Sequence, residues 1–140
     1  MDARCQCGLI RFTTSSAAPL KIYICHCLEC QRQASSTYGV SLVFPAFRFP
    51  EDVQQHLQCY TRTTFEGREK QCLFCKRCGS RIVHYIGGQK YMTFKACVEG
   101  LTREMMDKAV HIWTKRAIVP IPEGSEQHEE EPVGGTADGA

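Results

Sequence analysis

The stretch YICHCLECQRQ, residues 23–33, determines how the rest of the chain is interpreted, because it places three cysteines and a histidine within six positions. Two further cysteine motifs are a Cys-x-Cys at residues 5–7 and a Cys-x-x-Cys-Gly at residues 75–79. Alternate residues of an extended strand point to the same side, so a Cys-x-Cys can offer both sulfurs to one metal ion. A Cys-x-x-Cys-Gly turn curls round an ion, and its glycine is free to take a positive φ. The spacing of the cysteines therefore predicts metal binding.

Zinc chemistry suggests how the thiols are divided, since structural zinc is closed by four protein ligands whereas catalytic zinc usually has three and an open position. We predict that a four-cysteine cluster holds a structural zinc and joins the N-terminal strand to the middle of the chain: Cys5, Cys7, Cys75 and Cys78. The remaining cysteine trio, Cys25, Cys27 and Cys30, is predicted to bind a second zinc with an exchangeable fourth position. The spacing leaves an alternative open, in which Cys72, Cys97 or a histidine completes the trio and both sites are structural.

The cysteine content of the chain also bears on its environment. The chain has 140 residues, which favours a single domain, and 10 of them are cysteine, several-fold more than in an average protein. No apolar run in the sequence reaches the length of a membrane span, and the start MDARCQCG lacks the basic and apolar regions of a signal peptide. We therefore expect a cytoplasmic protein. In a reducing compartment, clustered cysteines favour metal binding over disulfide bonds.

Short strand-forming runs dominate the sequence. Five runs rich in β-branched and aromatic residues are separated by glycine and proline: LIRFTT, TYGVSLVF, LQCYTRTTF, RIVHYI and YMTFKACV. Helical patterns are limited to residues 28–36 and 102–110, and Thr102 is a candidate N-cap for the second. The sequence contains no internal repeat and no Rossmann or P-loop glycine signature. It therefore predicts a mainly β fold with one or two short helices.

Charge is divided unevenly along the chain. Residues 123–140 contain six of the 15 acidic residues and no lysine or arginine, so residues 1–122 carry a formal charge of +8. The acidic segment combines Gly, Glu and Pro without apolar periodicity, and we predict that it is a disordered, solubilising tail. The chain is therefore divided into a folded domain, residues 1–122, and a tail, residues 123–140.

The basic charge of the domain indicates the kind of partner. Five basic residues that lie close together in the sequence can attract an anionic small molecule: Arg62, Arg68, Lys70, Lys76 and Arg77. The same charge attracts nucleic acid, but the sequence has neither zinc-finger helix spacing nor a motif of interleaved aromatic and basic residues. We therefore expect a small-molecule substrate rather than nucleic acid or a membrane as the partner, and the sequence does not fix the oligomeric state.

Four motifs occur in a characteristic order: CQCGLIRF, CHCLECQRQASSTYG, LFCKRCGS and HIW. In this order and at these separations they resemble the glutathione-dependent formaldehyde-activating enzyme family, which includes the centromere protein V type of domain. The resemblance covers residues 4–122. It implies twisted antiparallel sheets in a β-tent arrangement organised around a structural zinc at the four-cysteine cluster. It also implies a more labile, catalytic zinc at the cysteine trio, hence two Zn²⁺ per chain, and carbon–sulfur lyase activity that involves glutathione.

The sequence departs from the family pattern at three places near the expected substrate site. Gln31 stands where members often have arginine, Ser35 and Ser36 stand where a Gly-Ser pair is common, and the stretch AIVPIP, residues 117–122, lacks a common tryptophan. The metal framework therefore matches the family, whereas these positions do not imply that glutathione and formaldehyde are the substrates.

The trio also indicates a reaction class. Three thiolates and Zn²⁺ carry a net charge of about −1, which suits a site that holds a further sulfur ligand. A coordinating thiol loses its proton, and its addition to an electrophilic carbon, or the reverse, forms or breaks a carbon–sulfur bond. We therefore predict a zinc-dependent lyase. His111 is a candidate proton carrier, and His26 is expected to point away from the metal. The alternative function is a zinc-stabilised binding module, for nucleic acid or a protein partner, in which both metals are structural.

Overall fold

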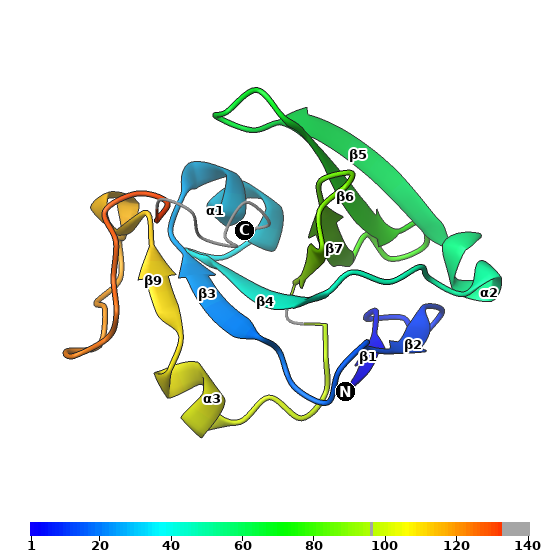
Figure 1. Cartoon of the computed structure of the whole chain (residues 1–140), viewed down its shortest axis with the longest axis horizontal. Helices are drawn as coiled ribbons and strands as arrows, with labels where there is room; N and C mark the ends of the chain where they lie inside the picture. The colour runs from blue at the N-terminus through cyan, green and yellow to red at the C-terminus, as the bar shows by residue number, and fades with distance from the viewer. Residues whose placement is uncertain (96, 133–140) are drawn as a thin grey trace.

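The structure is a computed structural model that describes residues 1–95 and 97–132 (Figure 1). Within these residues, a two-stranded sheet contains β1 (Asp2–Arg4) and β2 (Arg11–Thr13), and a seven-stranded sheet has the order β5-β6-β7-β8-β4-β3-β9. The strands of the larger sheet are β3 (Lys21–Cys25), β4 (Gly39–Pro45), β5 (Leu57–Thr63), β6 (Glu69–Cys75), β7 (Arg81–Tyr85), β8 (Tyr91–Phe94) and β9 (Val110–Ile112).

The described part of the chain has three short α-helices, α1 (Leu28–Ala34), α2 (Glu51–Gln54) and α3 (Arg103–Asp107), and a 3-10 turn, η1 (Thr114–Arg116). The predicted mainly β class is confirmed, but α2 adds a helix to the one or two expected. Thr102 caps α3 as predicted, because its hydroxyl accepts a hydrogen bond from the Met105 backbone N–H (3.2 Å). No helix among the described residues is long and apolar enough to cross a membrane.

The larger sheet contains one pairing that the sequence did not predict. Its neighbouring strands are antiparallel, except that β3 and β9 are parallel, with Tyr23 opposite Val110 and Cys25 opposite Ile112. A parallel pair needs a long crossover connection, and these two strands are joined by most of the chain. The strands that form this pair are adjacent in space although they are far apart in the sequence.

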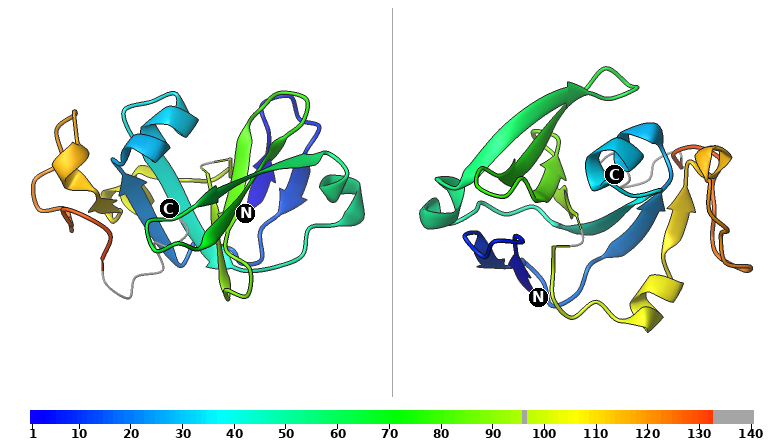
Figure 2. Two further views of the ribbon diagram at one scale, coloured as in Figure 1. Left: turned by 90° about the horizontal axis from the view of Figure 1, so that it is seen from above. Right: turned by 180° about the vertical axis from the view of Figure 1, so that it is seen from behind.

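The main core lies between the small sheet and the central strands of the larger sheet. Seven of its residues have no exposed surface: Ile10, Leu42, Phe44, Cys75, Ile82, Val83 and Phe94. The nearly continuous apolar run of β4 fits a strand that is covered on both faces. Figure 1, and the view from behind in Figure 2, show α1 between the limb formed by β5, β6 and β7 and the limb formed by β3 and β9. The helix α1 contains the second half of the motif at residues 23–33, so this part of the motif lies between the two limbs.

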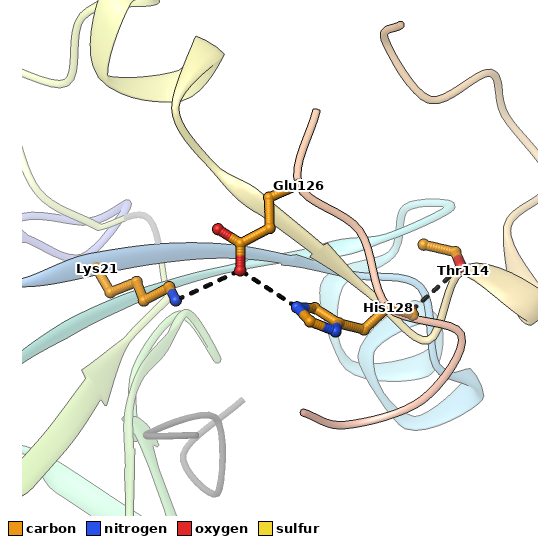
Figure 3. Close-up of polar contacts among 4 residues, drawn as sticks. All are labelled: Lys21, Thr114, Glu126 and His128. Carbon is orange, nitrogen blue, oxygen red and sulfur yellow. Dashed lines mark hydrogen bonds and ion pairs between the residues drawn. The ribbon is translucent and has the colours of Figure 1, made fainter. Parts of the chain in front are cut away.

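Residues 123–132, called the strap below, lie against the edge strand β9. The backbone N–H of His111 donates to the carbonyl of Glu126 (2.9 Å), and the backbone N–H of His128 donates to the carbonyl of His111 (2.8 Å). Glu126 also forms an ion pair with Lys21 (3.8 Å), and its carboxylate accepts a hydrogen bond from the His128 imidazole (3.2 Å) (Figure 3). The strap therefore has specific partners on the folded domain.

These contacts differ from the expectation of a disordered tail from residue 123 onward. The composition of the strap predicts little burial. It does not show that the edge strand β9 has backbone N–H and C=O groups available to hydrogen-bond with the strap. Residues 133–140 of the predicted tail lie outside the described residues. The boundary at residue 122 between a domain and a tail stays a prediction.

Candidate metal centres

The four-cysteine cluster joins the small sheet to the larger one. Its members Cys5 and Cys7 follow β1, Cys75 ends β6, and Cys78 lies in the turn before β7, and all four sulfurs lie within 4.8 Å of one another. The Sγ atoms of Cys5 and Cys7 are 3.5 Å apart, and those of Cys7 and Cys75 are 3.9 Å apart. Four sulfurs bound tetrahedrally to zinc lie about 3.8 Å apart, given a Zn–S distance of about 2.3 Å. The cluster therefore fits a zinc ion.

The two motifs that build this cluster differ in how well they were predicted. Gly79 has φ +74° and its N–H donates to the Cys75 carbonyl (2.8 Å), so the Cys-x-x-Cys-Gly motif forms the expected turn. Cys5 and Cys7 were expected on an extended strand, but they lie in a turn that begins after β1. The contact of Cys78 Sγ with the Ser80 hydroxyl (3.2 Å) lowers the pKa of the Cys78 thiol to about 5. The lowered pKa favours the thiolate form of Cys78, which is the form that binds a metal ion.

The cysteine trio lies where β3 passes into α1. Cys25 is the last residue of β3, Cys27 is the N-cap of α1, and Cys30 lies in its first turn, with all three sulfurs within 4.8 Å of one another. The Cys27 sulfur accepts a hydrogen bond from the Cys30 backbone N–H (3.4 Å), so the same atom caps the helix and faces the cluster. Gly39 permits this packing, because a Cβ at that position would lie 3.0 Å from the Cys30 Cβ.

The three thiols of the trio influence one another's ionisation. Contacts with Cys27 and Cys30, together with burial, raise the pKa of the Cys25 thiol, whereas contacts with Cys25 and Cys27 lower the pKa of Cys30 well below its usual value. These opposite shifts are what three adjacent acids show when ionisation of one opposes ionisation of the next. A divalent cation would offset this repulsion, so the donor set of the trio fits a zinc ion.

No fourth His, Cys, Asp or Glu in the described part of the chain joins the trio within 4.8 Å of all its sulfurs. The two cysteines that were considered as a fourth ligand have other partners. Cys72 Sγ lies 3.8 Å from the Lys70 carbonyl, and Cys97 Sγ lies 3.6 Å from the Ile82 carbonyl. Among these residues, the trio is therefore a three-ligand group.

A small cavity opens onto the trio. It has a volume of about 40 Å³, and Cys25 and Cys27 form part of its wall. Trp113 and Phe65 form another part, with their rings stacked at a centroid distance of 5.1 Å. Phe65 comes from the turn between β5 and β6, and Trp113 follows β9, so segments from both limbs of the sheet meet at this cavity.

Two basic side chains also line the trio cavity, Arg62 on β5 and Lys70 opposite it on β6. Only 3% of Lys70 is exposed, and burial, followed by repulsion from Arg62 and Lys95, lowers the pKa of the Lys70 ammonium to about 8. Of the basic residues expected to attract an anion, these two lie at the trio. Lys76 lies elsewhere and donates to the Gln55 carbonyl (2.7 Å).

His111, the candidate proton carrier, and His26 lie on the other face of the sheet from the trio. His111 is opposite Ile24 in the β3–β9 pair, and its Nδ1 is 3.0 Å from Nε2 of His26. Residues 24 and 25 point to opposite faces, so His111 and Cys25 are separated by the sheet. Both imidazoles border a separate cavity of about 520 Å³, and burial lowers their pKa values. His26 thus points away from the trio as expected, and the structure does not bring His111 to it.

The positions that depart from the family pattern are also explained locally. The Gln31 side chain donates to the carbonyls of His26 (2.8 Å) and Arg116 (3.3 Å), so it links α1 to η1. Ser35 ends α1 with a left-handed φ of +50°, and with Ser36 it lines a cavity on the Cys78 side of the helix. These serines were expected near the substrate, but they are separated from the trio cavity by α1.

Comparison with known proteins gives the family. A family model described as glutathione-dependent formaldehyde-activating enzyme matches residues 1–116, which include both cysteine clusters. This chain belongs to that family. A crystal structure of a Rhodobacter sphaeroides protein has the same fold as this family member, with a TM-score of 0.56 and 16% sequence identity over 79% of this chain and 99% of that one. The strap lies outside the residues that match the formaldehyde-activating family.

Several residues of the trio cavity were not predicted from the sequence, among them Trp113, Phe65 and Glu131. Trp113 belongs to the HIW motif, in which only His111 was predicted to have a role. Phe65 lies in a turn that carries no motif, and Glu131 belongs to the segment expected to be disordered. The sequence contains no signal that connects either residue to the trio.

Proposed function

We propose that this chain is a zinc-dependent enzyme that forms or breaks a carbon–sulfur bond in a small thiol adduct, at a metal held by Cys25, Cys27 and Cys30. The observation that carries the proposal is the three-ligand trio, which has no fourth protein ligand among the described residues and has Cys25 and Cys27 in the wall of a cavity. Structural zinc is typically closed by four ligands, and the other cluster of this chain has that form. The family is named for an enzyme that acts on formaldehyde with glutathione, which supports an adduct of that kind as substrate.

When bound at the trio, zinc would supply a Lewis-acid position at which a small thiol is held as its thiolate. The residues of the chain provide the rest of the site. Arg62 and Lys70 supply positive charge beside a trio that is anionic when its thiols ionise, and Trp113 with Phe65 forms an aromatic wall of the cavity. The cluster of Cys5, Cys7, Cys75 and Cys78 is assigned a structural zinc, which gives two Zn²⁺ per chain.

The proposal is tested by comparing one substitution at each metal cluster. Serine is among the best N-cap residues, so Cys27→Ser keeps a cap for α1 while it removes a metal ligand. We expect this variant to melt close to the wild type, to contain one zinc fewer, and to lose more than about 100-fold in turnover of formaldehyde with glutathione. Cys75→Ser should instead fail to fold, because structural zinc contributes about 10–16 kcal/mol in small zinc domains.

Cys59→Ser is the matched control, since Cys59 is exposed on β5 and lies outside both clusters. It should leave zinc content, melting temperature and turnover unchanged. Zinc content by mass spectrometry, thermal denaturation and the activity assay distinguish the outcomes. If Cys27→Ser retained both zincs and full turnover, the trio would not be the active site, and the proposal that the reaction occurs at the trio would fail.

A further inference from the structure

The strap reaches the trio cavity from outside the family-matched residues. Its backbone is fixed to the end of β9 and to η1, since Thr114 N–H donates to the His128 carbonyl (3.1 Å) and Trp113 N–H donates to the Glu130 carbonyl (3.4 Å). The next residue, Glu131, lines the cavity together with Cys25 and Cys27. The strap therefore places an acidic side chain in the proposed active site.

The cavity has little space for a substrate in this arrangement. Its volume is about 40 Å³, whereas pockets that bind small molecules measure about 300–1,000 Å³. Among the segments that line it, the turn that carries Phe65 and the strap are not part of the sheet. A thiol adduct can enter only if one of these segments moves, and the strap is held mainly by hydrogen bonds and ion pairs at the surface.

The charges in the cavity show which group the strap supplies. Lys70 is almost fully buried, and burial and the charges of Arg62 and Lys95 lower the pKa of its ammonium, whereas the charge of Glu131, which lines the same cavity, opposes this shift. Two other acids on the cavity rim are paired with arginines of their own segments, Glu29 with Arg32 and Glu66 with Arg68. The carboxylate of Glu131 is thus the strap's contribution to a basic subsite beside the trio.

We propose that Lys70 and Arg62 form the subsite that binds an anionic group, such as a carboxylate, of the thiol substrate, and that Glu131 occupies this subsite until the substrate displaces it. The inference rests on the proposed function, because it concerns the substrate of the same site. It adds that the substrate is anionic at a position away from its sulfur. It also makes the strap an internal competitor, which the family-matched part of the chain does not contain.

Two probes of equal size test the subsite: 3-mercaptopropionate, which carries a carboxylate, and its uncharged amide, 3-mercaptopropanamide. Each is titrated into the full-length cobalt-substituted protein, and binding is followed by the cobalt spectrum and by the fluorescence of Trp113, the single tryptophan of the chain. Trp113 lies in the cavity wall and its backbone holds the strap, so its emission reports entry of the probe and movement of the strap independently of turnover.

The variants change one charge at a time. Glu131→Gln should tighten binding of the carboxylate probe about three- to tenfold and leave binding of the amide probe unchanged. Glu129→Gln, the matched control at an exposed position of the same strap, should change neither. Arg62→Gln and Lys70→Met should weaken binding of the carboxylate probe selectively. Arg62 is only half-buried, so its variant keeps the test valid if Lys70→Met does not fold.

The outcomes separate this inference from the proposed function. If both probes shift the cobalt spectrum equally in the wild type and in Glu131→Gln, the open metal position stands and the anionic subsite is wrong. If neither probe shifts the spectrum in any variant, the open position itself fails and the subsite fails with it. If Glu131→Gln alters the cobalt spectrum before any thiol is added, Glu131 is a metal ligand. This result would contradict the proposal that Glu131 competes with the substrate for the anionic subsite.

Discussion

At the scale of single residues, the molecule buries several basic groups close to the trio. His84 on β7 is 2% exposed, and burial, together with the charges of Lys95 and Arg81, lowers the pKa of His84 well below its usual value. Nε2 of His84 lies 3.0 Å from Nη1 of Arg81. Because a guanidinium only donates, the imidazole must accept at this atom and is therefore neutral.

This neutral histidine predicts a pH dependence of stability. Below a pH of about 6.5 the unfolded chain binds a proton at His84 that the folded chain does not, so the stability present at neutral pH falls as the pH is lowered. The slope for one such group is about 1.4 kcal/mol per pH unit. His84→Gln keeps a hydrogen-bond acceptor for Arg81, but its side chain does not bind a proton in this pH range. Between about pH 7 and pH 5 the variant should therefore lose about 1–2 kcal/mol less stability than the wild type.

Urea denaturation of both proteins at several pH values measures this difference. Acid also protonates the metal-binding thiols, but that loss is common to the two proteins and cancels in the comparison. Parallel stability curves for the wild type and the variant would show that His84 is not the group that titrates.

Residues also differ in how well the sequence predicts them. The four-cysteine cluster and the trio were found by spacing, because two or three ligands of each site come from one short segment and the geometry of a bound ion restricts that segment. Lys70 and Glu131 meet at the trio cavity from segments about 60 positions apart. No local pattern links such residues, since their approach depends on how the whole sheet folds.

At the scale of elements, α1 and the strap illustrate opposite outcomes of local reasoning. The helix was predicted at residues 28–36 and ends at Ala34, because Ser35 takes a left-handed conformation. The strap was predicted to be disordered from its composition. It instead contacts β9 and η1, with ion pairs to Lys21 and Lys115 from its glutamates. Hydrogen bonding to an existing strand edge needs no apolar periodicity, so the composition could not predict it.

Deletion of residues 123–140 should therefore destabilise the domain. It removes four backbone hydrogen bonds from the strap to residues 111, 113 and 114. Each contributes about 0.5–1.5 kcal/mol, partly offset by the chain entropy that ordering the strap costs. We expect the melting temperature to fall by several degrees in a thermal scan.

A shorter deletion, of residues 133–140, provides the control, since it removes none of the described strap contacts. It should leave the melting temperature unchanged. If the long deletion melted at the wild-type temperature, the strap would contribute no stability and its contacts with β9 would be weaker than the structure indicates.

At the scale of the whole molecule, the two cysteine clusters lie between different elements of the fold. One joins β1 and the following turn to the end of β6, so it connects the two sheets. The other lies where β3 passes into α1, the helix that Figure 1 shows between the two limbs of the larger sheet. The mainly β class followed from the short strand-forming runs, and the order of three cysteine motifs indicated the family. The parallel β3–β9 pair and the position of the strap depend on long-range contacts, which no short pattern encodes.

We propose that the chain holds two zinc ions and that only the trio has a position open to a further ligand. X-ray absorption at the zinc edge tests it most directly when the protein is mixed with the selenol analogue of 3-mercaptopropionate, because selenium is distinguished from the sulfur of the protein. The prediction is two zincs per chain, seven cysteine sulfurs shared between them, and one zinc–selenium bond for every two zincs, formed more readily in Glu131→Gln. Four sulfurs at each zinc, with no zinc–selenium bond in either protein, would contradict the claim and leave a binding module with two structural metals.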